Sequence, residues 1–318
     1  MYAMRLKLFS LLSLCLIMLL SFGAAEGLAP LPMDSCVPGP APAREAFLSP
    51  TEYEDESISV KLYSGRYADT DYFYAHIKIS HPSQLRAAPA GLLASPERTF
   101  SFITENRGTL IAKAANAVIA INGDYYTNSD RCHVVLRQGR QIRNFANGTA
   151  DVLAVDVNGD FSVLKNCTKQ DYKNYYEQMG SQLYNVFTFG PLLVENGESV
   201  IPMGYNDSSI GSQKQTQRAA IAQLGPLEYM IIATNGPQSN GNKGMIIEDF
   251  AHVCEMAGKE LNENGCRIAY NLDGGGSATL VFWGESPDNG QFKPMRVNST
   301  DISERHLSDM IYFATLVK

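Results

Sequence analysis

Three hairpin signals constrain this chain more than any other feature of its sequence. Asn158-Gly159, Asn196-Gly197 and Gly225-Pro226 each separate two apolar segments of strand length. Tight turns of this kind use residues such as Asn and Gly, which accept positive φ values. A hairpin joins neighbouring antiparallel strands, so the sequence predicts an α+β fold with a mixed, largely antiparallel sheet and several helices.

Further segments predict the remaining elements of one domain, which we expect to span residues 56–318. Alternating or apolar segments predict strands at 57–64, 72–80, 117–122, 266–272, 278–283 and 310–317. Helical spacing predicts helices at 104–116, 171–184 and 245–261, the second of them with Asp171 as its N-cap. Residues 26–55 are rich in Pro and Ala near their start and predict a linker.

The first 25 residues predict an export signal. Arg5 and Lys7 precede the apolar run Leu8 to Leu20, and small residues follow near Ala25. The run is shorter than the roughly 20 apolar residues of a spanning helix, although an uncleaved membrane anchor stays open. We therefore expect a secreted or envelope-associated protein.

Charge and cysteine content limit the function classes. A formal net charge of −7 over 318 residues argues against a nucleic-acid binder, which would need many phosphate contacts. Five cysteines follow the signal, without the CxxC spacing of zinc or redox sites. In an exported chain they predict one or two disulfides, with Cys132–Cys167 and Cys254–Cys266 as the expected pairs.

The motif "NLDGGGSATL", at residues 271–280, lies between two predicted strands. Glycine inside a regular element costs about 0.5–1 kcal/mol relative to alanine, so three in a row need a cause. The order is neither that of a Walker loop nor that of a dinucleotide-binding turn. Asp273 is followed by unhindered N–H groups and the Ser277 hydroxyl, which together suit an anion. A plain turn between strands is the alternative at this stage.

Several other loops have similar chemistry at predicted strand ends. "INGDYY" places Asn122, Gly123 and Asp124 after one strand, and Arg218 stands at the entrance of another. A long polar loop, "TNGPQSNGNKGM", begins near Asn235 and separates a strand from a helix. If a shared sheet gathers these ends, we expect them to form one cleft with Asn271–Ser277.

In combination and order, these segments resemble the phosphodiester glycosidase family over roughly residues 100–318. The most specific element is "NLDGGGSAT", supported by "AINGDYY", "FGPLLVENG", "RAAIAQ" and the loop after Thr234. The chain departs from the family pattern at three places. Asp124 replaces a second glycine, Asn235-Gly236 replaces an Asp-Gly pair, and Arg218 to Ala222 replaces Arg-Thr-Ala-Ile-Gly.

The resemblance implies a hydrolase that removes a sugar from a phosphodiester. The leaving phosphate monoester is already a stable anion, with a second pKa of about 6, so it mainly needs its charge held. We expect Arg218 and the backbone of Gly274, Gly275 and Gly276 to hold it. A carboxylate must activate water or stabilise the sugar cation, with Asp273 as first choice and Asp124 as second.

The remaining site residues are expected to bind substrate. This group comprises Asn122, Gly123, Asn235, Asn271 and Ser277. The expected partner is a phosphorylated glycan or polysaccharide of the cell envelope or the extracellular space. No cofactor is required by the sequence, and a divalent metal such as Ca²⁺ stays open, because the Asp-containing loop at 286–290 lacks the spacing of a dedicated calcium loop. Two other functions stay open: a phosphodiesterase acting on a teichoic-acid-like polymer, and a non-catalytic glycan-binding protein.

Overall fold

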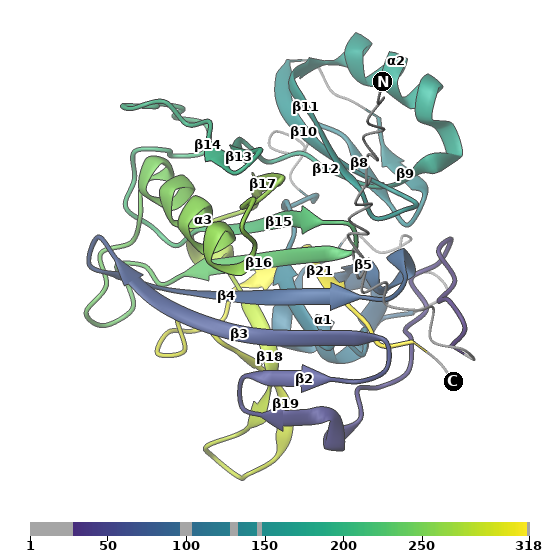
Figure 1. Ribbon diagram of the computed structural model, residues 1–318, viewed down its shortest axis with the longest axis vertical. Helices are drawn as coiled ribbons and strands as arrows, with labels where there is room; N and C mark the ends of the chain where they lie inside the picture. Colours follow the sequence, from purple (N-terminus) through teal and green to yellow (C-terminus); the bar gives the residue numbers. More distant parts are fainter. Residues whose placement is uncertain (1–27, 96–103, 128–132, 145–147, 317–318) are drawn as a thin grey trace, which may run out of the picture.

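The computed structural model describes residues 28–95, 104–127, 133–144 and 148–316 (Figure 1). The predicted export signal lies outside these residues. Within the described part of the chain, no helix is both long enough and apolar enough to cross a membrane.

The described parts of the chain contain four sheets, and we name three of them for reference. The large sheet has nine strands in the order β1 (Phe47–Ser49), β2 (Glu52–Glu54), β3 (Ile58–Tyr67), β4 (Thr70–Ile79), β16 (Glu228–Thr234), β15 (Ala219–Gly225), β17 (Ile268–Asn271), β13 (Leu192–Glu195) and β14 (Glu198–Ser199). The middle sheet has the order β19 (Phe292–Arg296), β18 (Leu280–Glu285), β7 (Ile119–Asn122), β21 (Asp309–Phe313) and β5 (Leu85–Pro89). The upper sheet has the order β11 (Phe161–Thr168), β10 (Thr149–Asp156), β12 (Leu183–Phe187), β8 (Val135–Arg137) and β9 (Arg140–Arg143). A short ladder joins β20 (His306–Leu307) to β6 (Asn106–Arg107).

The strand pairings confirm the α+β class and correct its detail. Every strand pairing among the described residues is antiparallel, and the strands form separate sheets instead of one mixed sheet. The predicted hairpins are present as β10–β11, β13–β14 and β15–β16. The expected single domain over 56–318 stays a prediction.

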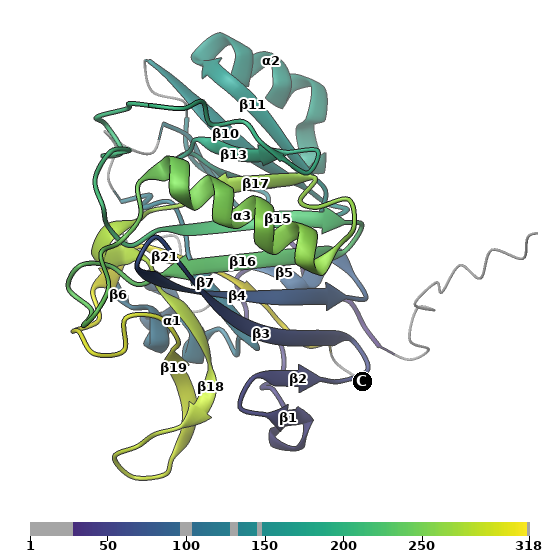
Figure 2. The same cartoon turned by 60° about the vertical axis from the view of Figure 1, so that its left-hand side comes forward.

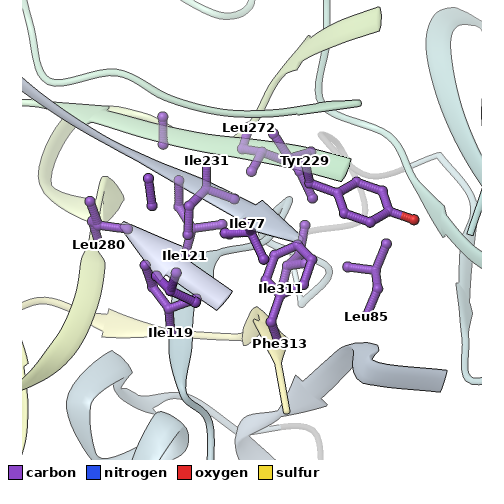
Figure 3. Close-up of a cluster of buried hydrophobic side chains, with 14 of the residues drawn as sticks. Ile77, Leu85, Ile119, Ile121, Tyr229, Ile231, Leu272, Leu280, Ile311 and Phe313 are labelled. Carbon is purple, nitrogen blue, oxygen red and sulfur yellow. The ribbon is translucent and has the colours of Figure 1, made fainter. Parts of the chain in front are cut away.

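The main core lies between the large and middle sheets. Ile77 and Ile231 of the large sheet meet Ile121 and Ile311 of the middle sheet in one cluster (Figure 3). Strand β15 is buried on both faces, because Ile221 faces this core while its neighbours of opposite parity face a helix. A strand covered on both sides reads as an unbroken apolar run, as this one does.

Each of the three α-helices within the described residues covers a sheet. Helix α3 (Ile247–Leu261) lies on the outer face of the large sheet, and α1 (Gly108–Ala114) packs against the middle sheet (Figure 2). Helix α2 (Lys169–Met179) covers the upper sheet. Its N-cap is Thr168, not the predicted Asp171, which instead completes a capping box at the third helical position.

Residues 28–55 differ from the predicted linker. They contribute β1 and β2 to the large sheet, and Leu31 and Cys36 are buried against the middle sheet. Arg86, itself fully buried, donates hydrogen bonds to the carbonyl oxygens of Pro32 and Ser35. A buried arginine therefore fixes a segment whose composition alone indicates little structure.

The predicted disulfide within the described residues is also corrected. Cys254 and Cys266 are both free and buried, with the Cys266 thiol 3.6 Å from the Cys254 carbonyl oxygen. Burial raises the pKa of Cys266 to about 12, so it is held as a neutral thiol. Cys167 is a free buried thiol, and its expected partner Cys132 lies outside the described residues.

Candidate active site

The predicted loops meet at one edge of the packed sheets. Strand β17 ends at Asn271 beside Ala220, and β16 ends where the Thr234 N–H donates to the Arg218 carbonyl at 2.9 Å. From the middle sheet, the Gly123 carbonyl after β7 accepts the Asp273 N–H at 3.2 Å. Because neighbouring strands run antiparallel, the beginning of one strand lies beside the ends of its neighbours. Loops that are distant in sequence therefore lie close together.

The Asn122 side chain holds the glycine loop, residues 273–277, by hydrogen bonds to the backbone at and just beyond its ends. Its side-chain amide donates to the Asp273 carbonyl at 2.8 Å and accepts the Thr279 N–H at 3.0 Å. The side chain is 1% exposed, so it fixes the two ends of the loop and cannot reach far into solvent.

Two of the three glycines are required, Gly274 by close approach and Gly275 by its backbone conformation. A Cβ on Gly274 would lie 2.9 Å from the Gln217 carbonyl oxygen, and Gly275 has a φ of +58°. The Gly275 N–H donates to that same Gln217 carbonyl at 2.8 Å, and the Ser277 N–H donates to Gly274 at 3.2 Å. These two N–H groups, which we expected to bind an anion, therefore donate to carbonyl oxygens within the protein.

Arg218 lies beneath this loop, but its guanidinium points elsewhere. It donates to the carbonyl oxygens of Met245 at 2.9 Å, Gly211 at 2.9 Å and Lys214 at 2.8 Å, and the residue is 2% exposed. Burial lowers the pKa of this arginine to about 10. Its place beside the glycine loop matches the prediction, whereas its contacts are those of a loop anchor and not of a phosphate ligand.

Asp124 belongs to a buried charged cluster that sequence reasoning missed. Arg137 donates to Asp124 at 2.6 Å and to Asp309 at 2.9 Å, and all three side chains are at most 1% exposed. The second Asp124 oxygen accepts the Thr188 N–H at 2.9 Å. We call Asp124, Arg137 and Asp309 the buried triad. The residue that replaces the family's second glycine is thus an ion-pair partner inside the protein.

Asp309 connects this triad to the surface. One of its carboxylate oxygens is buried with no hydrogen-bond partner among the described residues. Burial raises the pKa of Asp309 to about 6 against the effect of Arg137, and the charges of Asp124 and Asp273 add to the rise. Gly123 must be glycine here, because a Cβ would lie 2.2 Å from the Asp309 carboxylate.

A small pocket opens above these groups. Its lining includes Asn122, Gly123, Tyr125, Asp273, Ser277 and Asp309. Its volume of about 10 Å³ matches the space that one water needs. Tyr125 is held at a φ of +63°, a strained conformation of the kind that gathers at functional sites. The pocket therefore places room for a single water beside two carboxylates.

Arg305 is a third residue that sequence reasoning missed, after Arg137 and Asp309. It is exposed, it lies 5.7 Å above the Tyr125 ring, and its Cδ would be 3.5 Å from a Cβ on Gly276. Within the described residues it forms no salt bridge. The charged "ERH" stretch just before the last predicted strand was the available signal, because it stands at a strand entrance as Arg218 does.

Asn235 and Asn271 lie near the site as structural ties. Asn235 accepts the Ser299 N–H at 2.6 Å and so joins two surface loops. Asn271 donates to the Gly190 carbonyl at 2.6 Å, and its own amide oxygen is buried without a partner in the described part of the chain.

A larger cavity of about 660 Å³ begins at Gly190. It lies between the upper sheet, the β13–β14 hairpin and the loop after β14. We call it the side cavity. Nowhere in the described ranges do three or more His, Cys, Asp or Glu side chains form a group suited to a metal ion.

Carboxylates and a cation, gathered at strand ends of an antiparallel α+β fold, define a polar site beside the glycine loop. The sequence model of the phosphodiester glycosidase family matches residues 115–314. The chain belongs to this family. No curated protein sequence matches the chain.

Solved structures of similar fold extend the comparison. The catalytic domain of zebrafish N-acetylglucosamine-1-phosphodiester alpha-N-acetylglucosaminidase, auto-inhibited by pro-peptide, is 15% identical, with 87% of each chain covered and a TM-score of 0.58. A hypothetical protein from Synechocystis is 14% identical, with 85% of this chain and 64% of that chain covered and a TM-score of 0.49. At such identities the zebrafish domain supports a shared fold.

Proposed function

We propose that this protein is an exported hydrolase that cleaves a glycosyl phosphodiester in a cell-envelope or extracellular glycan. The observation that carries the proposal is the pocket for one water between Asp273 and Asp309, on the loop most specific to the family, with Arg305 beside it. The zebrafish enzyme of similar fold is named for action on a sugar phosphodiester, which agrees with this chemistry.

In this proposal Asp273 directs the water in the pocket onto the anomeric carbon. The bond from that carbon to the phosphate oxygen breaks, and Asp273 accepts the proton that the water releases. The phosphate monoester leaves as an anion and needs no proton from a strong acid. A positioned carboxylate of this kind contributes typically about 10²–10⁴-fold to the rate.

Arg305 replaces Arg218 as the proposed phosphate ligand. An arginine pairs with phosphate through two parallel N–H bonds, which requires a guanidinium that solvent and substrate can reach. Arg305 is exposed beside Gly276, whereas the guanidinium of Arg218 donates to backbone carbonyls. We assign Asp124 and Asn122 to positioning, because their polar atoms hold Arg137 and the glycine loop.

The test is product analysis on a set of glycosyl phosphate diesters. The proposal expects free sugar plus a phosphate monoester. A sugar that retains its phosphate would identify a phosphodiesterase instead. Binding without any turnover, measured by calorimetry beside the same assay, would identify a non-catalytic glycan-binding protein.

A further inference from the structure

The side cavity has the size and the position of a second binding site. At about 660 Å³ it lies within the range of roughly 300–1,000 Å³ that small-molecule sites occupy. Its lining includes Gly190, whose carbonyl accepts the Asn271 amide two residues before Asp273. The cavity lining is thus hydrogen-bonded to the end of β17, the strand that leads into the glycine loop.

Local backbone geometry directs polar side chains into the cavity from the upper sheet. The pairing of β10 with β11 shifts register between Ala150 and Val152, and Asn166 has a φ of +47°. Bulges next to binding sites commonly re-aim a side chain in this way. Asp151 stabilises the distortion, since its two oxygens accept the Asn166 N–H at 2.8 Å and the Leu192 N–H at 3.0 Å. The Asn166 side chain is left exposed at the rim.

The opposite wall is the loop that follows β14. Tyr205 and Asp207 face the cavity from this loop, and Ser209 donates to Asp207 through its N–H at 2.9 Å and its hydroxyl at 2.6 Å. Burial raises the pKa of Tyr205 to about 12, and the charges of Asp207 and Asp151 add to the rise. Tyr205, Asp207 and Asp151 thus line one cavity together.

The charge of the lining disfavours anionic ligands such as phosphate groups. Among the described residues of the lining, two carboxylates, Asp151 and Asp207, face one lysine, and that lysine, Lys165, is itself paired with Glu195 at 2.7 Å. A phosphate group would meet net negative charge here, whereas sugar hydroxyls can donate to carboxylates and accept from amide, ammonium and phenol groups. The Tyr205 ring adds an apolar face of the kind that sugar rings cover.

We infer that the side cavity binds a neutral, hydroxyl-rich segment of the glycan, beyond the sugar whose phosphodiester bond is cut. This inference rests on the proposed function and adds a substrate class to it. The phosphate is held at Arg305, and uncharged sugars occupy the cavity between Asn166 and Tyr205. The preferred substrate is thus a phosphodiester carried on a neutral oligosaccharide, not a small glycosyl phosphate.

A glycan array tests this inference on the intact protein. Neutral oligosaccharides are expected to bind and counterparts sulfated on every sugar to bind less, and the best neutral tetrasaccharide is then titrated. Tyr205→Phe removes one hydroxyl, and Asn166→Gly removes one amide while keeping the positive φ. Each is expected to weaken affinity by roughly 2- to 10-fold, the loss of one or two hydrogen bonds.

Two matched controls lie outside the cavity lining. Tyr176→Phe changes an exposed tyrosine on α2, and Asn196→Gly changes another asparagine of positive φ, at +52° in the β13–β14 turn. Both are expected to bind the tetrasaccharide as the unmodified protein does.

The outcomes separate this inference from the proposed function. An array on which no neutral glycan binds, or equal losses in Asn166→Gly and Asn196→Gly, overturns the cavity assignment. Turnover of a minimal methyl glycosyl phosphate beside that result leaves the proposed function standing. If the cavity variants lose binding of neutral glycans and no diester is turned over, the cavity assignment is supported and the proposed hydrolase function is overturned.

Discussion

Two charged regions of the site differ in solvent access: the buried triad, and the rim of the small pocket, formed by Tyr125 and Arg305. Asp309 belongs to the triad and also lines the pocket. In the triad, Arg137 is fully buried and lies between two carboxylates at 2.6 and 2.9 Å. At the rim, Arg305 is exposed over Tyr125 and forms no ion pair within the described residues. The first arrangement pairs its charges inside the protein and leaves one Asp309 oxygen without a hydrogen bond among the described residues, whereas the second leaves a cation for a ligand.

This difference shows why residue type alone does not assign a role. Three aspartates and three arginines lie at or near one site, yet burial and partners divide them. Asp124, Arg137 and Arg218 have their polar atoms bonded inside the protein, while Asp273 and Arg305 border solvent. The following predictions test the division.

The largest effect is expected for Asp273→Asn. The change keeps the volume and removes the charge that directs the water, so kcat should fall by about 10²–10⁴-fold while the fold is retained. Steady-state kinetics beside circular dichroism measures both. Asp288→Asn, in an exposed loop, is the matched control. Full turnover in the Asp273 variant would assign this aspartate to the structural side of the comparison.

Arg137→Met should act on stability. Removing the cation leaves two carboxylates buried, and loss of one partner of a buried ion pair commonly costs about 3–5 kcal/mol. Urea unfolding measures the free energy of unfolding. Arg267→Met, which breaks the exposed pair with Asp160 at 3.4 Å, should cost about 0–1 kcal/mol. Equal costs for the two variants contradict the separation of triad from rim.

Arg305→Ala should act on substrate binding. A hydrogen bond to a charged group is worth about 1.5–3 kcal/mol, so KM should rise by roughly 10- to 100-fold, with stability little changed. The loss should shrink as salt is added, because exposed charges are screened. Arg66→Ala, at an exposed pair with Asp71 on the β3–β4 hairpin, is the control. If Arg218→Ala stays folded and raises KM, while Arg305→Ala leaves KM unchanged, then Arg218 is the phosphate ligand, as the sequence predicted.

Asp309→Asn should give the smallest effect, visible in the pH dependence of stability. The folded-state pKa of Asp309 is raised from 3.8 to about 6, so the folded protein binds this proton more tightly than the unfolded chain. Stability from this group therefore increases as pH falls from about 6 to about 4, by at most about 1.4 kcal/mol per pH unit. The unmodified protein should gain stability relative to Asp309→Asn over that interval. A constant difference between the two from pH 7 to pH 4 contradicts the raised pKa.

The sequence predicted the local parts of this fold well. Turn chemistry located the hairpins, and strand ends located the loops that meet at the site. The buried triad was out of reach, because Arg137 and Asp309 are 172 positions apart and nothing local to either marks their pairing. Arg218 shows the same limit in another form. A basic residue at a strand entrance is usually solvated, and only the path of residues 211–214 shows that carbonyl oxygens surround this one.

The hydrogen bonds between Arg218 and residues 211–214 bear on how the side cavity could change. Arg218 secures the wall of the side cavity through the carbonyl oxygens of Gly211, Ser212 and Lys214, groups that every amino acid carries. The attachment at Arg218 therefore does not depend on which side chains the wall carries, Tyr205 and Asp207 among them. Changes in those side chains would alter what the cavity accepts while this backbone attachment is kept.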